Sequence, residues 1–447
     1  MNHKTDVVQG DYMYNEKINY NYLRNKKATN LREWHNKEFK KKDSLNVEIF
    51  ENATILPLKK FEGDSLLFGR GGLVDKNGHY VEKSAIKNRV EFSYEFEIKE
   101  RKEETVVYCG YLVNHWGHFL IEAVSRLWYF LEEDKSIDKY VFFIDFEETR
   151  EIKGNYKEFF ELLGIWNKIE IINKATQYKK VIVPDLGYKW LDYYSDQYKN
   201  IFNRIADNIK INSEWESKEK IFLTRSYLKK AQKVEFGLDM LDNYYMKNGY
   251  EVIAPENLTL SHLIYLIRNA KICASISGTL PHNMLFAKDN QKLVIIERNI
   301  INNEIQANIN IIKQLYVTYI DANIAIYPVH IGHGPFIFSY SGLLEKYTKD
   351  NNYIPPKEKY CSNIYLKRCF KKYMKEYRAF YHYQWFMEDW EVPYTDYIRE
   401  AYIDGLKYFE KYLNGDKPFK VSQYFRIHYI KQFIKKIIKK LKKENIL

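Results

Sequence analysis

The chain has 447 residues, of which 45% are hydrophobic and 29% are charged, a balance that is ordinary for a folded protein. Its 40 tyrosines, 26 phenylalanines and 8 tryptophans exclude an intrinsically disordered chain, because disordered segments are poor in aromatic residues. Four cysteines without Cys-x-x-Cys spacing exclude a disulfide scaffold and argue against a zinc site, and a reducing cytoplasm is expected. The sequence has no run of 18 apolar residues, so it does not predict a membrane-spanning helix.

The net charge of +11 is concentrated near the C-terminus. Ten basic residues and no acidic one lie between Lys417 and Lys443, so the other residues sum to about zero. Apolar residues recur there at helical spacing, which predicts a basic amphipathic helix over 417–447. Residues 417–443 could bind an anionic membrane surface, although a helix docked on its own domain has the same pattern. We do not expect nucleic acid as a partner, because the body of the chain has no basic stripe.

Residues 1–45 are polar and predict an N-terminal arm, which precedes an α/β domain over 46–212. Short apolar runs and runs of helical spacing predict the elements of this domain. Strands are expected at 47–57, 90–98, 105–112, 140–144, 168–172 and 180–184, and helices at 116–133, 156–163 and 192–211. The run Gly69-Arg70-Gly71-Gly72 lacks the strand–helix context of a phosphate loop and is interpreted as a turn.

A regular alternation of strands and helices follows over 213–345 and predicts a Rossmann-like domain with a parallel sheet. Strands are expected at 220–224, 251–254, 271–275, 292–297 and 316–321, and helices at 236–248, 261–269, 280–287 and 303–314. Ligands of such sheets bind beyond the carboxyl ends of the strands. Residues 346–416 are rich in aromatic residues and predict a helical C-terminal segment.

The first candidate site begins the predicted helix 116–133 with the run Asn114-His115-Trp116-Gly117-His118. Asn114 is expected to cap the helix, and His118 and Glu122 lie one turn apart on it. A carboxylate beside an imidazole fixes its tautomer and raises its basicity, so this pair has the chemistry of a general base. Because Arg126 continues the same spacing, a capped helix with a surface salt-bridge ladder also explains the pattern.

The second candidate site is the turn between a predicted strand and helix, Ser277-Gly278-Thr279-Leu280-Pro281-His282-Asn283. A helix N-terminus presents free backbone N–H groups, and the hydroxyls beside it complete an anion site that suits a diphosphate. A plain strand–helix turn explains the same residues.

Two further candidates lie at strand ends of the same predicted sheet. Arg225 follows the first strand, and its guanidinium could bind a phosphate through two hydrogen bonds. Lys229, Lys230 and Lys233 come next, and such a run is usually a solvated cluster, although Lys230 remains a candidate. Glu297 closes another strand, where a carboxylate can bind ribose hydroxyls.

Three segments together resemble glycosyltransferase family 61, a group that includes bacterial capsule and lipopolysaccharide enzymes. They are His115–Glu122, which resembles the His-x-x-Gly-His-Phe block with its following acid; Ile221–Arg225, which resembles the strand ending in Ser-Arg; and Ser277–Glu297, which resembles the Gly-x-x-x-x-Asn-x-x-Phe block and the strand ending in Glu. The chain departs from many relatives at Gln232, where they have a second arginine, and at Ile276–Thr279, where they have His-Gly-Ala.

The resemblance implies an α/β fold of the GT-B type, with two Rossmann-like domains facing a cleft, and an inverting enzyme that requires no metal. The absence of an Asp-x-Asp pair agrees with the last point, and no cofactor is expected. The donor would be a nucleotide-diphosphate sugar, expected to be UDP-linked, on 213–345, and the acceptor a glycan or lipid-linked oligosaccharide on 46–212.

In this scheme His118 is the base, oriented by Glu122, and Glu122 itself or His115 is the alternative base. The donor side comprises Arg225, Lys230, Ser277, Gly278, Thr279, His282, Asn283 and Glu297. The enzyme would be cytoplasmic, at the inner face of the plasma membrane, and would act in surface polysaccharide synthesis. Two other classes stay open: a non-catalytic glycan- or nucleotide-binding protein of the same fold, and a nucleic-acid-binding protein that acts through its tail.

Overall fold

The computed structural model describes residues 14–35, 39–60, 70–85, 93–132, 136–190, 192–299, 303–324, 334–340 and 342–380. The predicted basic helix of 417–447 lies outside the described residues, as does about half of the segment 346–416, from residue 381 onward. Within the described ranges, no helix combines the length and the apolar character needed to cross a bilayer.

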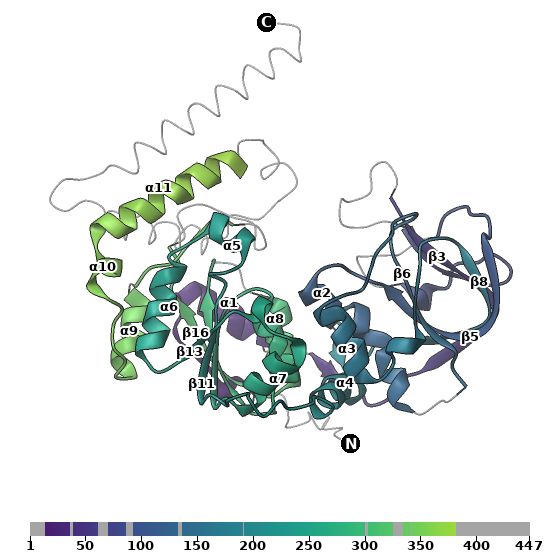
Figure 1. Cartoon of the computed structure of the whole chain (residues 1–447), viewed down its shortest axis with the longest axis horizontal. Coiled ribbons are helices and arrows are strands. Elements are labelled where there is room, and N and C mark those ends of the chain that lie inside the picture. The colour runs from purple at the N-terminus through teal and green to yellow at the C-terminus, as the bar shows by residue number, and fades with distance from the viewer. Residues whose placement is uncertain are drawn as a thin grey trace, which may run out of the picture.

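The first half of the chain is built on a six-stranded sheet (Figure 1), whose strands are β3 (Val47–Lys59), β4 (Arg70–Val74), β5 (Glu100–Tyr111), β6 (Lys139–Phe143), β7 (Ile169–Ile172) and β8 (Thr176–Pro184). Their order is β4-β3-β8-β5-β6-β7. β8, β5, β6 and β7 pair in parallel, but β3 is antiparallel to both β4 and β8. The sheet is therefore mixed, and the prediction of a fully Rossmann-like first domain is wrong at this edge.

The predicted glycine turn is wrong, because Gly71 and Gly72 lie within β4. A Cβ atom at Gly71 would lie 2.8 Å from the carbonyl oxygen of Pro57 on β3, so glycine permits the close approach of the two strands. The predicted strand 90–98 is also absent from its described part, 93–98.

Helices and short strands complete this half: η2 (Glu82–Ser84), α2 (Trp116–Ile121), η3 (Ala123–Glu132), α3 (Asn155–Leu163), η4 (Trp166–Lys168), α4 (Asp196–Asp207), β2 (Lys40–Lys41), β9 (Tyr188–Lys189) and β10 (Tyr193–Tyr194). The helix α4 illustrates how a local sequence pattern determines a helix. Ser195 caps its first turn by accepting a hydrogen bond from the Tyr198 amide, and apolar residues at helical spacing, Tyr198, Ile201, Phe202 and Ile205, are buried.

The second half contains a six-stranded sheet in which every neighbouring pair is parallel, as predicted. Its order is β1-β16-β15-β14-β11-β13, from β1 (Ile18–Tyr22), β16 (Tyr316–Asp321), β15 (Lys292–Glu297), β14 (Ile272–Ile276), β11 (Lys220–Leu223) and β13 (Glu251–Ile253).

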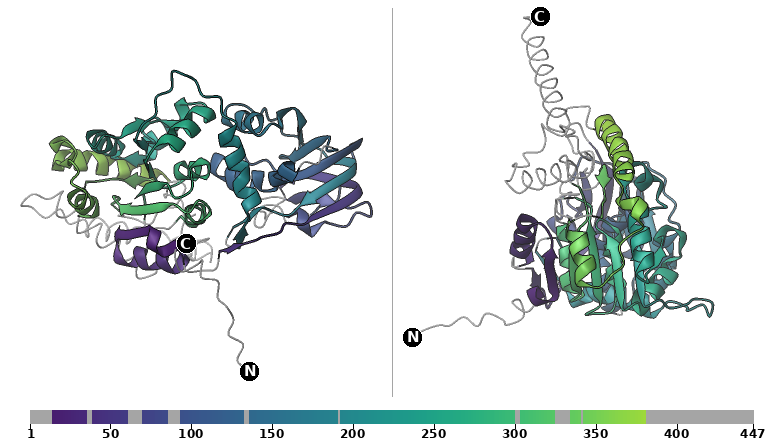
Figure 2. Two further views of the ribbon diagram at one scale, coloured as in Figure 1. Left: turned by 90° about the horizontal axis from the view of Figure 1, so that it is seen from below. Right: turned by 90° about the vertical axis from the view of Figure 1, so that its left-hand side faces the viewer.

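The N-terminal residues belong to this second sheet, so the prediction of a separate arm over 1–45 is wrong for them. β1 pairs with β16, and it buries the alternate residues Ile18, Tyr20 and Tyr22. The helix α1 (Asn25–His35) follows, and Figure 2 shows these N-terminal elements, in purple, against the green elements of the second half.

The helices of the second half cover both faces of its sheet. The remaining elements are η1 (Tyr14–Lys17), α5 (Lys229–Val234), β12 (Glu235–Phe236), α6 (Leu238–Lys247), η5 (Pro255–Asn257), α7 (Leu260–Asn269), η6 (Leu280–Phe286), α8 (Glu304–Ile312), β17 (Phe336–Ile337), α9 (Gly342–Asp350), α10 (Glu358–Cys361) and α11 (Asn363–Phe380). α7 and α8 lie on the side of the first half, and α6 and α9 on the other side (Figure 1). α11 packs on β12 and β17.

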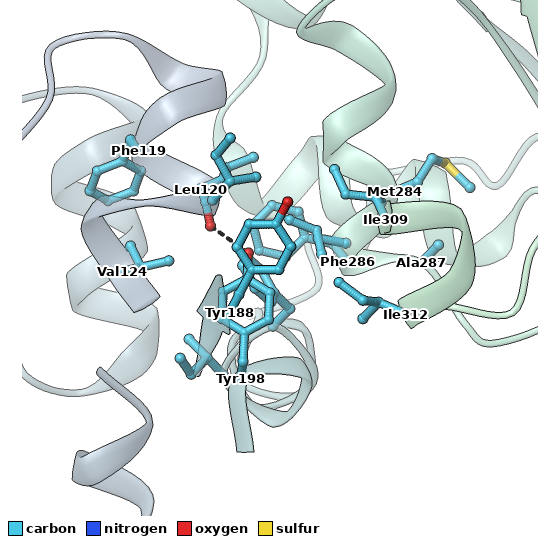
Figure 3. Packing of buried hydrophobic residues seen from close by; sticks show 14 of the residues in the cluster. Phe119, Leu120, Val124, Tyr188, Tyr198, Met284, Phe286, Ala287, Ile309 and Ile312 are labelled. Atoms are coloured by element: carbon cyan, nitrogen blue, oxygen red, sulfur yellow. Dashed lines mark hydrogen bonds between the residues drawn. The ribbon is translucent and has the colours of Figure 1, made fainter. Parts of the chain in front are cut away.

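One continuous apolar cluster joins the two halves (Figure 3). Phe119 and Leu120 of α2 share it with Met284 and Phe286 of η6, and the hydroxyl of Tyr198 donates a hydrogen bond to the carbonyl of Leu120 over 2.8 Å. This packing holds the start of α2, with its histidines, against the loop that follows β14.

Candidate functional site

The predicted base and its carboxylate lie together at the start of α2. The Nδ1 atom of His118 is 3.2 Å from Oε1 of Glu122, and the His118 side chain is one-third exposed. The N-cap is His115 rather than the predicted Asn114, and its imidazole lies 4.9 Å from that of His118, measured between ring centres. The three candidates for the base therefore form one group at the protein surface.

The predicted salt-bridge ladder does not extend to Arg126. The α-helix ends at Ile121, and the chain continues as the 3-10 helix η3. Because a 3-10 helix has three residues per turn, Arg126 does not lie on the same face as His118, eight residues earlier. Arg126 is buried, and it donates hydrogen bonds to the carbonyls of Pro184 and Lys83. The His118–Glu122 contact thus stands apart from the structural arginine.

The start of α2 packs directly on the Ser277–Thr279 turn. The indole Nε1 of Trp116 donates a hydrogen bond to Oδ1 of Asn283 over 2.9 Å. A Cβ atom at Gly117 would lie 3.0 Å from Nδ1 of His282 and 3.1 Å from Cγ2 of Thr279, so the absence of a side chain permits the contact. The two motifs that the sequence singled out in different halves therefore meet at one seam.

The turn itself is anchored by the residue after β15. Ser277 accepts a hydrogen bond from the backbone amide of Arg298 over 3.1 Å, and Gly278 has a φ of +124°, which favours glycine. The predicted helix after the turn is wrong in type, because η6 is a 3-10 helix of seven residues. So short a segment offers little macrodipole, and an anion site here must depend on side chains.

His282 is a buried histidine at the seam, and neither ring nitrogen has a hydrogen-bond partner among the described residues. Burial, together with the nearby His118, His115 and Arg298, lowers its pKa to about 3. The imidazole is therefore neutral at ordinary pH.

Arg225 lies in a group of three charged residues, Arg225, Glu235 and Arg298, which we call the arginine cluster. The Nε atom of Arg225 is 2.8 Å and 3.0 Å from the two carboxylate oxygens of Glu235, and Nη1 of Arg298 is 3.4 Å from the same carboxylate. The Glu235 side chain is almost fully buried. Lys230, by contrast, is exposed on α5, and so are its neighbours Lys229 and Lys233.

Glu297 lies in a buried group that we call the balanced cluster: Arg24, Lys27, Glu297 and Asp321. Lys27 of α1 is 2.9 Å from the Glu297 carboxylate and 3.3 Å from that of Asp321, which also contacts Arg24. Burial raises the pKa of Glu297, against the opposing effect of Lys27. The predicted ribose-binding carboxylate is thus engaged with a lysine from the N-terminal segment.

The glycosyltransferase 61 family model matches residues 116–294, from the start of α2 into β15. The matched region is less than half of the chain, and it supports membership of this family. The match identifies the chain as a glycosyltransferase. The crystal structure of the glycosyl transferase family 9 from Veillonella parvula DSM 2008 is similar at 9% identity, covering 50% of this chain and 86% of that one, but its TM-score of 0.24 is too low to bear on the fold. A comparison with curated proteins gives no match.

Sequence reasoning missed three residues that contact or adjoin the candidate residues: Arg298, Glu235 and Lys27. Arg298 follows Glu297 directly, so the expectation that ligands bind beyond the carboxyl ends of the strands applies to both residues. Glu235 and Lys27 carried no signal, because each meets its partners only through the fold. Among the described residues no group of His, Cys, Asp or Glu side chains suits a metal ion, and metal independence stays a prediction.

Proposed function

We propose that this glycosyltransferase moves a sugar from a nucleotide-diphosphate donor, expected to be UDP-linked, to a glycan or lipid-linked acceptor with inversion at the anomeric carbon. The carrying observation is the seam at which Gly117 of α2 meets Thr279 and His282 of the donor-side turn. It supports a site in which a base from one half faces a donor held by the other, as in a GT-B arrangement.

His118 would take the proton of the acceptor hydroxyl while the acceptor oxygen bonds to the anomeric carbon and the bond to the diphosphate breaks. Glu122, 3.2 Å away, would hold the imidazole and stabilise its protonated form. Arg225 and the Ser277–Thr279 turn would stabilise the charge on the departing diphosphate, and Asn283 would support the turn. No role toward the ribose is proposed for Glu297, because its buried carboxylate is paired with Lys27.

The substitution His118→Ala tests this role. We expect turnover, measured as nucleotide release from donor and acceptor, to fall by about 10²- to 10⁴-fold, while nucleotide binding in a thermal-shift assay is retained. His79→Ala is the control, since this exposed histidine of the first half is far along the chain from α2. Turnover near that of the unaltered chain in His118→Ala would remove the proposal, and Glu122→Gln and His115→Ala would then test the alternative bases.

The cellular role is proposed from the family resemblance and the basic tail. Synthesis of a bacterial surface polysaccharide takes place on lipid-linked intermediates, and a basic amphipathic helix would hold a cytoplasmic enzyme at the anionic inner face of the plasma membrane. If a chain ending at Asn414 floats with anionic liposomes as the full chain does, residues 417–443 are not the anchor.

A further inference from the structure

The donor side of the site has an unusual charge arrangement beneath the Ser277–Thr279 turn. Arg298 follows β15, and its guanidinium carbon would lie 3.0 Å from a Cβ atom at Gly278. The same group lies 4.7 Å from the ring centre of Phe336 on β17. Because glycine leaves this face of the turn open, the Arg298 guanidinium lies directly beside the backbone of the predicted diphosphate site.

The carboxylate of Glu235 contacts both this arginine and Arg225. Glu235 forms part of β12, which pairs with β17, so its position is fixed by backbone hydrogen bonds. Arg225 contacts Glu235 through Nε, and no described residue accepts a hydrogen bond from its Nη1 or Nη2. The Arg225 side chain is 14% exposed. Its terminal amino groups are thus available to a ligand on the side away from Glu235.

The charges of the arginine cluster do not cancel. Two guanidinium groups share one carboxylate, so the three side chains carry a net charge of +1. Burial lowers the pKa of Arg298 to about 10; Arg225 acts in the same direction, and Glu235 and Glu297 oppose the shift. Guanidinium groups bind phosphates through charge-assisted hydrogen bonds, so two of them near the turn suit a diphosphate.

Resting on the proposed function, we propose that Arg298 is the second cation for the donor's diphosphate, and that Glu235 is the positioning residue that sets both arginines toward it. The family resemblance implies a second arginine at the position of Gln232, which is exposed and donates a hydrogen bond to the Ser226 carbonyl. The fold supplies the charge from the end of β15 instead.

The test compares nucleotides with two phosphates and one. Dissociation constants for uridine diphosphate and uridine monophosphate are measured by calorimetry for the unaltered chain, Arg298→Met and Arg298→Lys. We expect Arg298→Met to weaken the binding of the diphosphate about 10- to 100-fold, because a hydrogen bond to a charged group is lost. The binding of the monophosphate should change by less than about threefold. Arg298→Lys keeps the positive charge, so its dissociation constant for the diphosphate should lie between those of the unaltered chain and Arg298→Met. It replaces Arg298→Met in the test if the methionine variant does not fold.

Arg268→Met is the matched control. This arginine pairs with Asp207 and lies in the last turn of α7, just before β14 begins, whereas Arg298 lies beyond the end of β15. It should leave both constants unchanged. Equal diphosphate affinities for the unaltered chain and the Arg298 variants would overturn the assignment of Arg298 alone. Failure of the unaltered chain to bind the diphosphate of uridine, guanosine or adenosine would overturn the proposed function as well.

Discussion

Two buried charged clusters meet at the end of β15, and they differ in their charge balance. In the balanced cluster, two cations face two carboxylates, and the Lys27, Glu297 and Asp321 side chains are all at most 3% exposed. In the arginine cluster, two guanidinium groups contact one carboxylate, that of Glu235. Arg225 is 14% exposed, which is similar to the 18% of Arg24 in the balanced cluster, so the two clusters differ in charge rather than in burial. Neighbouring residues, Glu297 and Arg298, belong to different clusters. The comparison indicates that a cluster with cancelling charges ties the fold together, whereas one with excess charge beside an open turn suits a ligand.

The largest effect is expected from breaking the balanced cluster with Lys27→Met. Glu297 would lose its lysine partner while it remains buried, and Asp321 would keep only Arg24, so we expect the free energy of unfolding to fall by about 3–5 kcal/mol. Urea denaturation followed by tryptophan fluorescence measures the loss. Lys230→Met, at an exposed position on α5, should change it by less than about 0.5 kcal/mol. A loss from Lys27→Met as small as that of the control would show that the cluster does not tie α1 to the sheet.

The effect of pH on His282 sharpens the comparison, because a proton there would add to the positive charge near Arg298. Burial lowers the pKa of His282 to about 3, from 6.5. The unfolded chain therefore takes up a proton below pH 6.5 that the native chain does not, and stability falls as the pH drops from 6.5 toward 3. At pH 5 the loss amounts to about 2 kcal/mol.

His282→Asn removes this titration, so its stability loss between pH 8 and pH 5 should be smaller by about 2 kcal/mol, as urea midpoints at the two pH values would report. His35 is also buried with a pKa lowered to about 4, but it titrates in both proteins and cancels from the difference. His79→Ala should keep the full pH dependence. The same pH dependence in His282→Asn would mean that the native protein accommodates the charged imidazole.

Features with a local cause could be predicted from the sequence. The regular alternation over 213–345 gave the parallel sheet, because each strand and helix shows its own hydrophobic period. The i, i+4 spacing of His118 and Glu122 predicted their contact, since only one helical turn separates them. η3 and η6 were predicted as helices but not as 3-10 helices, because a period of three residues resembles that of an α-helix over so short a length.

Features that depend on distant contacts could not be predicted. β1 pairs with β16 across almost 300 residues, and its five-residue pattern does not identify its partner strand. The carboxylate of Glu235 meets Arg298, 63 residues away, only because β12 pairs with β17. Lys27 likewise reaches Glu297 only through the edge strand that precedes α1.

The smallest effect is expected from Gln232→Arg, which introduces the second arginine that the family resemblance implies. If Arg298 already supplies the second cation, an added arginine at this exposed position contributes only as a surface charge, worth about 0.2–1 kcal/mol. The affinity for uridine diphosphate should therefore rise by no more than about fivefold, as calorimetry would measure, and the affinity for the monophosphate should hardly change. A gain of two orders of magnitude for the diphosphate would mean that the arginine cluster lacks a cation that the relatives' position supplies, and that its excess charge does not serve the donor.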